Sequence, residues 1–149
     1  MEATANLLAP TLENPRPRAI ARYAATAARV LLGLVFFVFG LDGFLNFVPK
    51  PDPSTMHPGS VALFTAMVAS GYLFQLIKGT EVLVGVLLLA NRFVPLALVV
   101  LAPVMVNIVL FTVFFSPSGL AIPIVLVLLQ LALAWKHRAA YRSVLAARA

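Results

Sequence analysis

The stretch GYLFQLIKGTEVLVGVLLLANR, residues Gly71 to Arg92, decides the fold class of this chain. At about 1.5 Å of rise per residue, roughly 20 helical residues reach about 30 Å, the thickness of the hydrocarbon core of a bilayer. Lys78 and Glu81 lie near the middle of this stretch, where each charge costs at least about 2.5–3.5 kcal/mol. We therefore expect the helix to turn both side chains toward other helices or a wet cavity, at the centre of a small helical bundle.

Lys78, Glu81 and Gly85 share one face of that helix because they are spaced i, i+3 and i+7. A glycine on this face allows a neighbouring backbone to approach closely. Gly33 and Gly40 lie seven residues apart in an earlier apolar segment, and they are also expected at a helix–helix contact.

The composition of the whole chain indicates a membrane protein. Its 149 residues are 62% apolar and 11% charged, whereas a soluble domain is closer to half apolar and a quarter charged. The net charge of +6 would suit a nucleic-acid partner. However, the basic residues lie at the ends of apolar segments, which is the pattern of membrane topology. We expect the lipid bilayer as a partner, and no nucleic acid.

Four apolar segments predict an all-α membrane protein, a four-helix transmembrane bundle. The expected spans are residues 27–48, 71–90, 93–115 and 120–135, all within a transmembrane domain of residues 23–142. The apolar run Val61–Ala69 is too short to cross, so we expect it in the interface or packed on the end of the bundle. Pro103 is expected to kink the third span near Val99.

Both termini of a chain with four spans lie on the same side of the membrane. Residues 1–22 are predicted to be a disordered cytoplasmic arm, and residues 143–149 a basic cytoplasmic tail. Lys50 is the single basic residue expected on the opposite side, and Lys78 lies within the membrane. The basic residues on the terminal side are Arg16, Arg18, Arg22, Arg29, Arg92, Lys136, Arg138, Arg142 and Arg148. This asymmetry follows the positive-inside rule, so both termini are expected in the cytoplasm.

Counting from the midpoint of each span places Asp42, Lys78 and Asn107 at nearly one depth, with Glu81 one turn below. We expect a buried polar cluster in which Asp42 and Glu81 share Lys78. Such a cluster is a candidate site for a polar headgroup or a proton. An equal alternative is structural, because buried ion pairs and asparagines also hold transmembrane helices together. Gln130, the one strongly polar side chain of the fourth span, lies toward the inner side.

Missing residue types exclude several kinds of chemistry. The chain has no cysteine, so a disulfide scaffold and thiol redox chemistry within it are excluded. Its two histidines, His57 and His137, lie outside the expected spans, so a haem with two axial histidines is not expected. No metal-ligand spacing and no nucleophile–base pair is found. We expect no metal and no covalently bound cofactor, and any redox chemistry would need an electron carrier or a partner subunit.

Two segments of the chain resemble the DoxX family of small four-span bacterial membrane proteins. They are GLVFFVFGLDGFLNFVP, residues 33–49, and SGYLFQLIKGTEVLVGVLLLANRFVPLALVVLAPVMVNIVLF, residues 70–111. The positions that match family patterns are Glu81 and Gly85 in E-x-x-x-G, and Asn91, Arg92, Pro95, Pro103 and Asn107 in N-R-x-x-P…P-x-x-x-N. The histidine that often follows Leu-Phe in the family is Thr112 here.

The resemblance implies a multi-pass protein of the bacterial cytoplasmic (inner) membrane that is associated with a redox complex. We expect an accessory subunit with a redox protein as partner. It is expected to bind a lipophilic molecule such as a quinone near Asp42, Lys78, Glu81 and Asn107. The alternatives are a structural or interaction module without a ligand, and a quinone-linked oxidoreductase subunit. The sequence leaves open whether there is catalysis, and what the oligomeric state is.

Overall fold

The computed structural model describes residues 16–141, and the regular elements in that range are all helical. They are α1 (Arg16–Leu45), η1 (Pro53–Thr55), α2 (Pro58–Ala69), α3 (Leu73–Leu89), α4 (Val94–Phe115), η2 (Pro117–Gly119), α5 (Ala121–Lys136) and α6 (Arg138–Tyr141). The predicted all-α class is confirmed for this part of the chain. Because α1 begins at Arg16, residues 16–22 of the expected arm are helical. The rest of that arm and the basic tail lie outside the described residues.

Two of the helices are long and apolar enough to cross a membrane. They are α1, counted from Ala19 over 27 residues, and α4, with 22 residues. α2 and α3 pass the same test only together, and they meet at an angle of 91°. α5 is apolar but has only 16 residues. By length and composition, two helices within residues 16–141 therefore qualify as spans, or three if the bent pair is one span.

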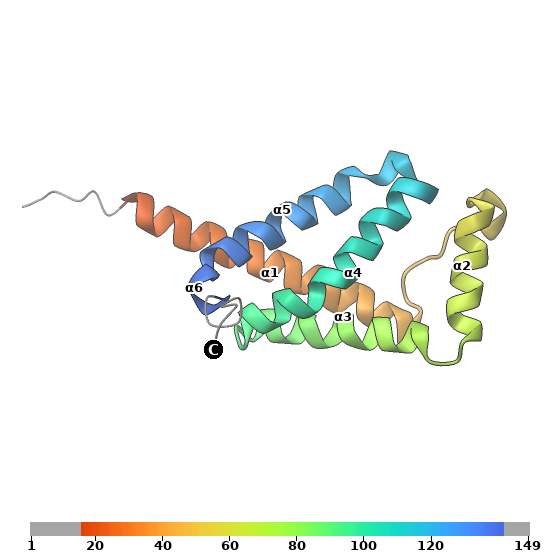
Figure 1. Ribbon diagram of the computed structural model, residues 1–149, viewed down its shortest axis with the longest axis horizontal. Coiled ribbons are helices and arrows are strands. Elements are labelled where there is room, and N and C mark those ends of the chain that lie inside the picture. Colours follow the sequence, from red (N-terminus) through yellow and green to blue (C-terminus); the bar gives the residue numbers. More distant parts are fainter. Residues whose placement is uncertain (1–15, 142–149) are drawn as a thin grey trace, which may run out of the picture.

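α1 and α3 lie side by side in opposite directions, and α4 and α5 pack against them (Figure 1). The α4–α5 hairpin diverges from α1 and α3 toward the loop that joins its two helices. α2 stands nearly perpendicular to α3 at one end of the bundle, where it contacts α3 and α4. The short apolar segment of the sequence is thus a separate helix at the end of the bundle, which is one of the two placements expected for it.

The buried core lies where the four longest apolar helices meet. It contains Leu32 and Phe36 of α1, Val84 and Leu88 of α3, Val94, Ala97, Leu98, Leu101 and Met105 of α4, and Leu126 and Leu133 of α5. The same helices carry many large apolar side chains on their outer faces, among them Phe39, Leu83 and Phe114. An apolar surface of this extent is typical of a protein that faces lipid.

Glycines allow α1 and α3 to approach closely, as the sequence predicted. A Cβ added at Gly85 of α3 would lie 2.6 Å from the backbone nitrogen of Phe37 on α1. A Cβ at Gly40 of α1 would lie 2.8 Å from the backbone nitrogen of Val82 on α3. Since backbone atoms cannot move aside as flexible side chains can, neither position has room for a methyl group. The predicted helix-contact role of these two glycines is confirmed.

Long-range hydrogen bonds join several helix ends at one end of the bundle. Arg29 of α1 donates through Nη1 to the carbonyl oxygens of Leu88 and Leu89 at the end of α3, the second at 3.3 Å. The last carbonyl groups of a helix lack their usual i+4 donors, and a cation there complements the helix dipole. The Tyr141 hydroxyl donates to the Pro95 carbonyl oxygen at 3.1 Å, and burial raises the pKa of this tyrosine.

We predict that Gly85→Ala lowers the free energy of unfolding by about 1–3 kcal/mol, because the added methyl group collides with the backbone of α1. Gly79→Ala is the matched control, because a Cβ at Gly79 would meet nothing within 4 Å. This control is expected to be neutral or to stabilise the helix by about 0.5–1 kcal/mol. Unfolding of the detergent-purified protein measures both changes. Equal stability of the two variants would contradict the close packing of α1 and α3.

Candidate functional site

The two charges in the middle of α3 form an ion pair. Lys78 donates through Nζ to Glu81 Oε2 at 2.8 Å. The Glu81 side chain is 6% exposed and that of Lys78 is 23% exposed. Lys78 Nζ also lies 3.4 Å from the carbonyl oxygen of Phe39 on α1. A Cβ at Gly43 of α1 would collide with the aliphatic part of Lys78, so this glycine makes room for the lysine.

Asp42 does not share Lys78, which differs from the cluster expected from the sequence. Its carboxylate is paired with Lys50 through Oδ2, and Oδ1 accepts the backbone N–H of Val48 at 2.7 Å. Both partners lie in the loop that follows α1, where Asn46 has a left-handed φ of 51°. A carboxylate in the last turn of a helix is unfavourable beside the negative end of the helix dipole, so a cation from the following loop neutralises it.

Asn107 lies on the outside of the bundle, apart from the Lys78–Glu81 pair. It is exposed on α4, as are Pro103 and Leu110 on either side. The side-chain hydrogen bonds of α4 within residues 16–141 do not include its amide. The structure therefore gives Asn107 neither the expected place beside Lys78 nor a bond to the backbone near Pro103. Whether any of the four residues contacts a ligand stays a prediction.

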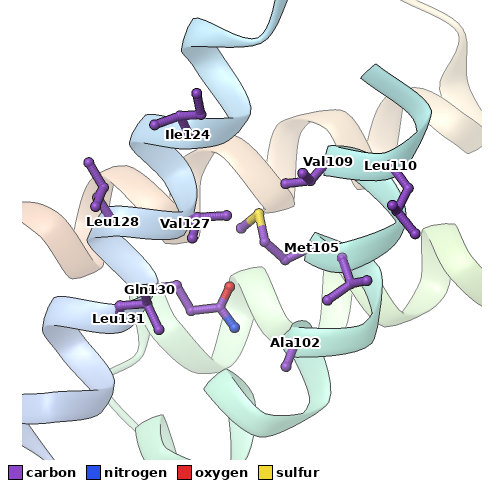
Figure 2. A pocket seen from close by; sticks show the side chains of 10 residues that line it. Ala102, Met105, Val109, Leu110, Ile124, Val127, Leu128, Gln130 and Leu131 are labelled. Atoms are coloured by element: carbon purple, nitrogen blue, oxygen red, sulfur yellow. The ribbon is translucent and has the colours of Figure 1, made fainter. Parts of the chain in front are cut away.

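A cavity that sequence reasoning missed lies between α4 and α5, and we call it the α4–α5 groove (Figure 2). Its volume is about 430 Å³. The lining consists of Ala102, Met105, Val106, Val109 and Leu110 on α4 and Ile124, Val127, Leu128, Gln130 and Leu131 on α5. All of these side chains except Gln130 are apolar, and several, such as Val106 and Leu128, are exposed on the outer face of the bundle. The groove therefore opens on the surface that would face lipid.

Gln130 supplies the polar atoms of the α4–α5 groove. Its side-chain nitrogen donates to the carbonyl oxygen of Leu98 on α4 at 2.9 Å. The next carbonyl, that of Val99, lacks its usual i+4 donor because Pro103 has no N–H, although α4 continues through this proline. The bond to Leu98 orients the amide, and its oxygen points toward Met105 and the groove (Figure 2). Within residues 16–141 this oxygen accepts no hydrogen bond, so one unused acceptor borders a groove whose surface is almost wholly apolar.

Two polar residues outside the long helices have structural roles. Asp52 accepts the backbone N–H of Ser54 at 2.9 Å at the start of η1, and this hydrogen bond lowers the pKa of its carboxyl group. His57 accepts the backbone N–H of Gly59 through Nδ1 at 3.1 Å and so caps α2. The His57 ring also packs on Phe115, with 5.3 Å between ring centroids.

Neither metal binding nor similarity to known proteins adds a further candidate site. Among residues 16–141, no group of three or more histidine, cysteine or acidic side chains is placed to hold a metal ion. No protein-family model, curated protein or solved structure matches the chain. The features that bear on function are therefore the ion pair, the α4–α5 groove and the exposed surfaces.

We predict that Lys78→Met destabilises the protein by roughly 3–5 kcal/mol, because it leaves the buried Glu81 carboxylate without its partner. Glu81→Gln should cost less, since Lys78 is partly exposed and can still hydrogen-bond to the amide oxygen. The double variant should be more stable than Lys78→Met alone, because it leaves no unpaired charge. Chemical or thermal unfolding in detergent tests this order. A double variant that loses the sum of the two single effects would show that the charges do not act as a pair.

Proposed function

We propose that the protein is a multi-pass membrane protein whose α4–α5 groove binds a lipophilic molecule carrying a hydroxyl group. The observation that supports this proposal is the unused amide oxygen of Gln130 in an otherwise apolar groove. A buried acceptor gains a hydrogen bond when a hydroxyl donor enters, and the apolar body of the ligand covers the rest of the lining. A quinol offers such a donor, whereas an oxidised quinone carries only acceptors. Within the quinone class, the reduced form is therefore the one that can donate to the unused Gln130 oxygen.

The dimensions and the position of the groove fit this class of ligand. Its volume of about 430 Å³ falls within the range of small-molecule sites, and it suits a ring headgroup better than a whole isoprenoid quinone. The exposed lining residues Val106, Leu128 and Leu131 would allow a long apolar tail to continue into the surrounding lipid. Entry would occur sideways from the bilayer.

We infer that four helices cross the membrane, with both termini in the cytoplasm. α3 and α5, with 17 and 16 residues, reach about 24–26 Å, and both contribute to the core beside α1 and α4. At the end of the bundle where α3 ends and α4 begins, Arg29 and Tyr141 bring α1 and α6 close. Basic residues are enriched on the cytoplasmic side of membrane proteins, so the basic residues of α1 and α6 support a cytoplasmic location for the end of the bundle where α3 ends. Lys50 lies in the loop after the opposite end of α1.

The cellular setting is proposed from the resemblance of residues 33–49 and 70–111 to the DoxX family. It supports a bacterial inner-membrane protein that serves as an accessory subunit of a redox-associated complex. Because the chain has no cysteine, electrons leaving a bound quinol would pass to a carrier in a redox partner protein. If this electron transfer occurs during catalytic turnover, the protein is a quinone-linked oxidoreductase subunit.

A second candidate function, an interaction module, is favoured by the exposed Asn107. A side-chain amide that faces hydrocarbon leaves donors and an acceptor unpaired, and asparagines in transmembrane helices usually bond to another helix. The amide carries both donors and an acceptor, so it can pair with its own copy across a two-fold axis. If the outer face of α4 contacts the same face of a second chain, the Asn107 amide gains hydrogen-bond partners.

The ligand proposal predicts that a soluble short-tail quinol raises the unfolding midpoint of the purified protein, since binding stabilises the folded state. Val106→Trp should abolish the shift, because the large ring fills the groove while the Gln130–Leu98 bond remains. Gln130→Leu should also abolish it, whereas Gln75→Leu, on the exposed face of α3, should not. A shift that survives Val106→Trp but disappears in Glu81→Gln would move the site to the ion pair.

The interaction proposal predicts that Asn107→Leu weakens association of two chains by about 1–2 kcal/mol, whereas Asn107→Gln retains it. Because the chain has no cysteine, single cysteines report proximity without background. Asn107→Cys should form disulfide-linked dimers in oxidised membranes, and Leu83→Cys, exposed on α3, should not. A monomeric protein in which neither cysteine cross-links would refute a contact between copies at α4.

A further inference from the structure

A second groove lies between the first part of α1 and the end of α5, and we call it the α1–α5 groove. Its volume is about 660 Å³. The lining consists of Ala21, Arg22, Ala24, Ala25 and Ala28 on α1 and Leu129, Ala132, Leu133 and Lys136 on α5. It shares no lining residue with the α4–α5 groove, so it is a separate site.

Small side chains at helical spacing produce this groove. The alanines of α1 follow the order i, i+3, i+4, i+7, which places them on one face of the helix. The lining residues of α5 follow the same order and face them. Because alanine ends at Cβ, the alanine face of α1 leaves open space beside α5. The lining contributed by these faces is apolar except at the positions of Arg22 and Lys136.

The two cations lie at the same end of the groove. The start of α1 and the end of α5 are on the same side of the molecule (Figure 1); Arg22 lies near the start of α1, and Lys136 is the last residue of α5. Ala28 and Leu129 lie about two turns further in, roughly 10 Å along the helices. Both cations are exposed, and the ion pairs within residues 16–141 do not involve them. The groove thus has a positively charged mouth and an apolar interior.

We propose that the α1–α5 groove binds an anionic phospholipid, with the phosphate between Arg22 and Lys136 and one acyl chain along the alanine face of α1. Cations at the edge of a groove between membrane helices attract phosphate headgroups, and the apolar interior excludes water only when a hydrocarbon chain fills it. A lipid with an uncharged headgroup would leave the two cations without a counter-charge, and a zwitterionic lipid such as phosphatidylcholine would bring its own cation close to them. A soluble anion would leave the apolar part of the groove empty. The bound lipid would fill the space between α1 and α5.

The test uses the full-length protein, purified in detergent and depleted of lipid. Phosphatidylglycerol is expected to raise the unfolding midpoint in a concentration-dependent manner, as a ligand of the folded state does. Phosphatidylcholine and inorganic phosphate, each added alone, should give no comparable shift. A shift with phosphatidylcholine equal to that with phosphatidylglycerol would overturn the preference for a net anionic lipid. A full shift with inorganic phosphate would overturn the role of the acyl chain.

Two kinds of variant separate the groove from general surface charge. Arg22→Gln combined with Lys136→Gln should weaken the apparent affinity for phosphatidylglycerol at least tenfold. The control removes the same charge at Arg92 and Arg138, two exposed cations outside the groove, and should retain wild-type affinity. Equal weakening in both double variants would mean that overall charge, and not this groove, attracts the lipid.

The apolar part of the groove is tested by Ala24→Phe, which fills the groove and leaves both cations in place. Ala24 is exposed, so this variant is expected to fold, and its midpoint without lipid verifies that. It should lose the shift with phosphatidylglycerol, whereas Ala62→Phe on the exposed face of α2 should keep it. A full shift in Ala24→Phe would overturn the proposed acyl-chain site.

Discussion

The close contact between α1 and α3 is the constraint on which the rest of the structure depends. Backbone atoms fill the places where side chains at Gly40 and Gly85 would stand, so the two helices have a single register. This register places the Lys78–Glu81 pair against α1, where the charges neutralise each other instead of facing lipid. Arg29 fixes the other end of the contact by bonding to the last carbonyl groups of α3. Once these two helices are joined, α4 and α5 can pack on them with one face and leave the other to the bilayer.

The two grooves follow from the way in which α5 completes this bundle. α5 contacts both α1 and α4, and where either neighbour carries small side chains, such as Ala25 or Ala102, space remains open beside it. The polar atoms in the two spaces differ in kind. Gln130 offers an acceptor, whereas Arg22 and Lys136 offer positive charge. We therefore propose that α5 lines two apolar sites with different chemical preferences, one for a hydroxyl group and one for a phosphate.

The sequence was enough to predict the helices, the glycine contacts and the burial of Lys78 and Glu81 against other helices. It was enough because α3 carries polar residues and a glycine on one face. That face fixes the rotation of the helix about its axis. α4 is apolar apart from Asn107 and Thr112, so its sequence does not show which face turns inward, and a depth count alone placed Asn107 beside Lys78. The predicted pairing of Asp42 with Lys78 was wrong for another reason. Lys50 reaches Asp42 because the loop turns back at Asn46, and the sequence does not show this turn. Gln130 and Pro103 were both visible in the sequence, and a polar residue facing a proline-containing helix is the signal that could have indicated the groove.

The ion pair in the middle of α3 is, for a physical reason, a weaker candidate for ligand binding than a neutral amide. Lys78 and Glu81 satisfy each other, and the lysine also has the Phe39 carbonyl oxygen within reach, so a ligand entering there would have to replace existing interactions. The oxygen of Gln130 has no hydrogen-bond donor among residues 16–141. It lies in apolar surroundings, where a new hydrogen bond contributes most to the free energy of binding. We therefore expect a ligand to gain more free energy at α5 than at α3, although α3 carries the charges. We therefore propose that the ion pair acts mainly in assembly of the bundle, and that the α4–α5 groove is the ligand site.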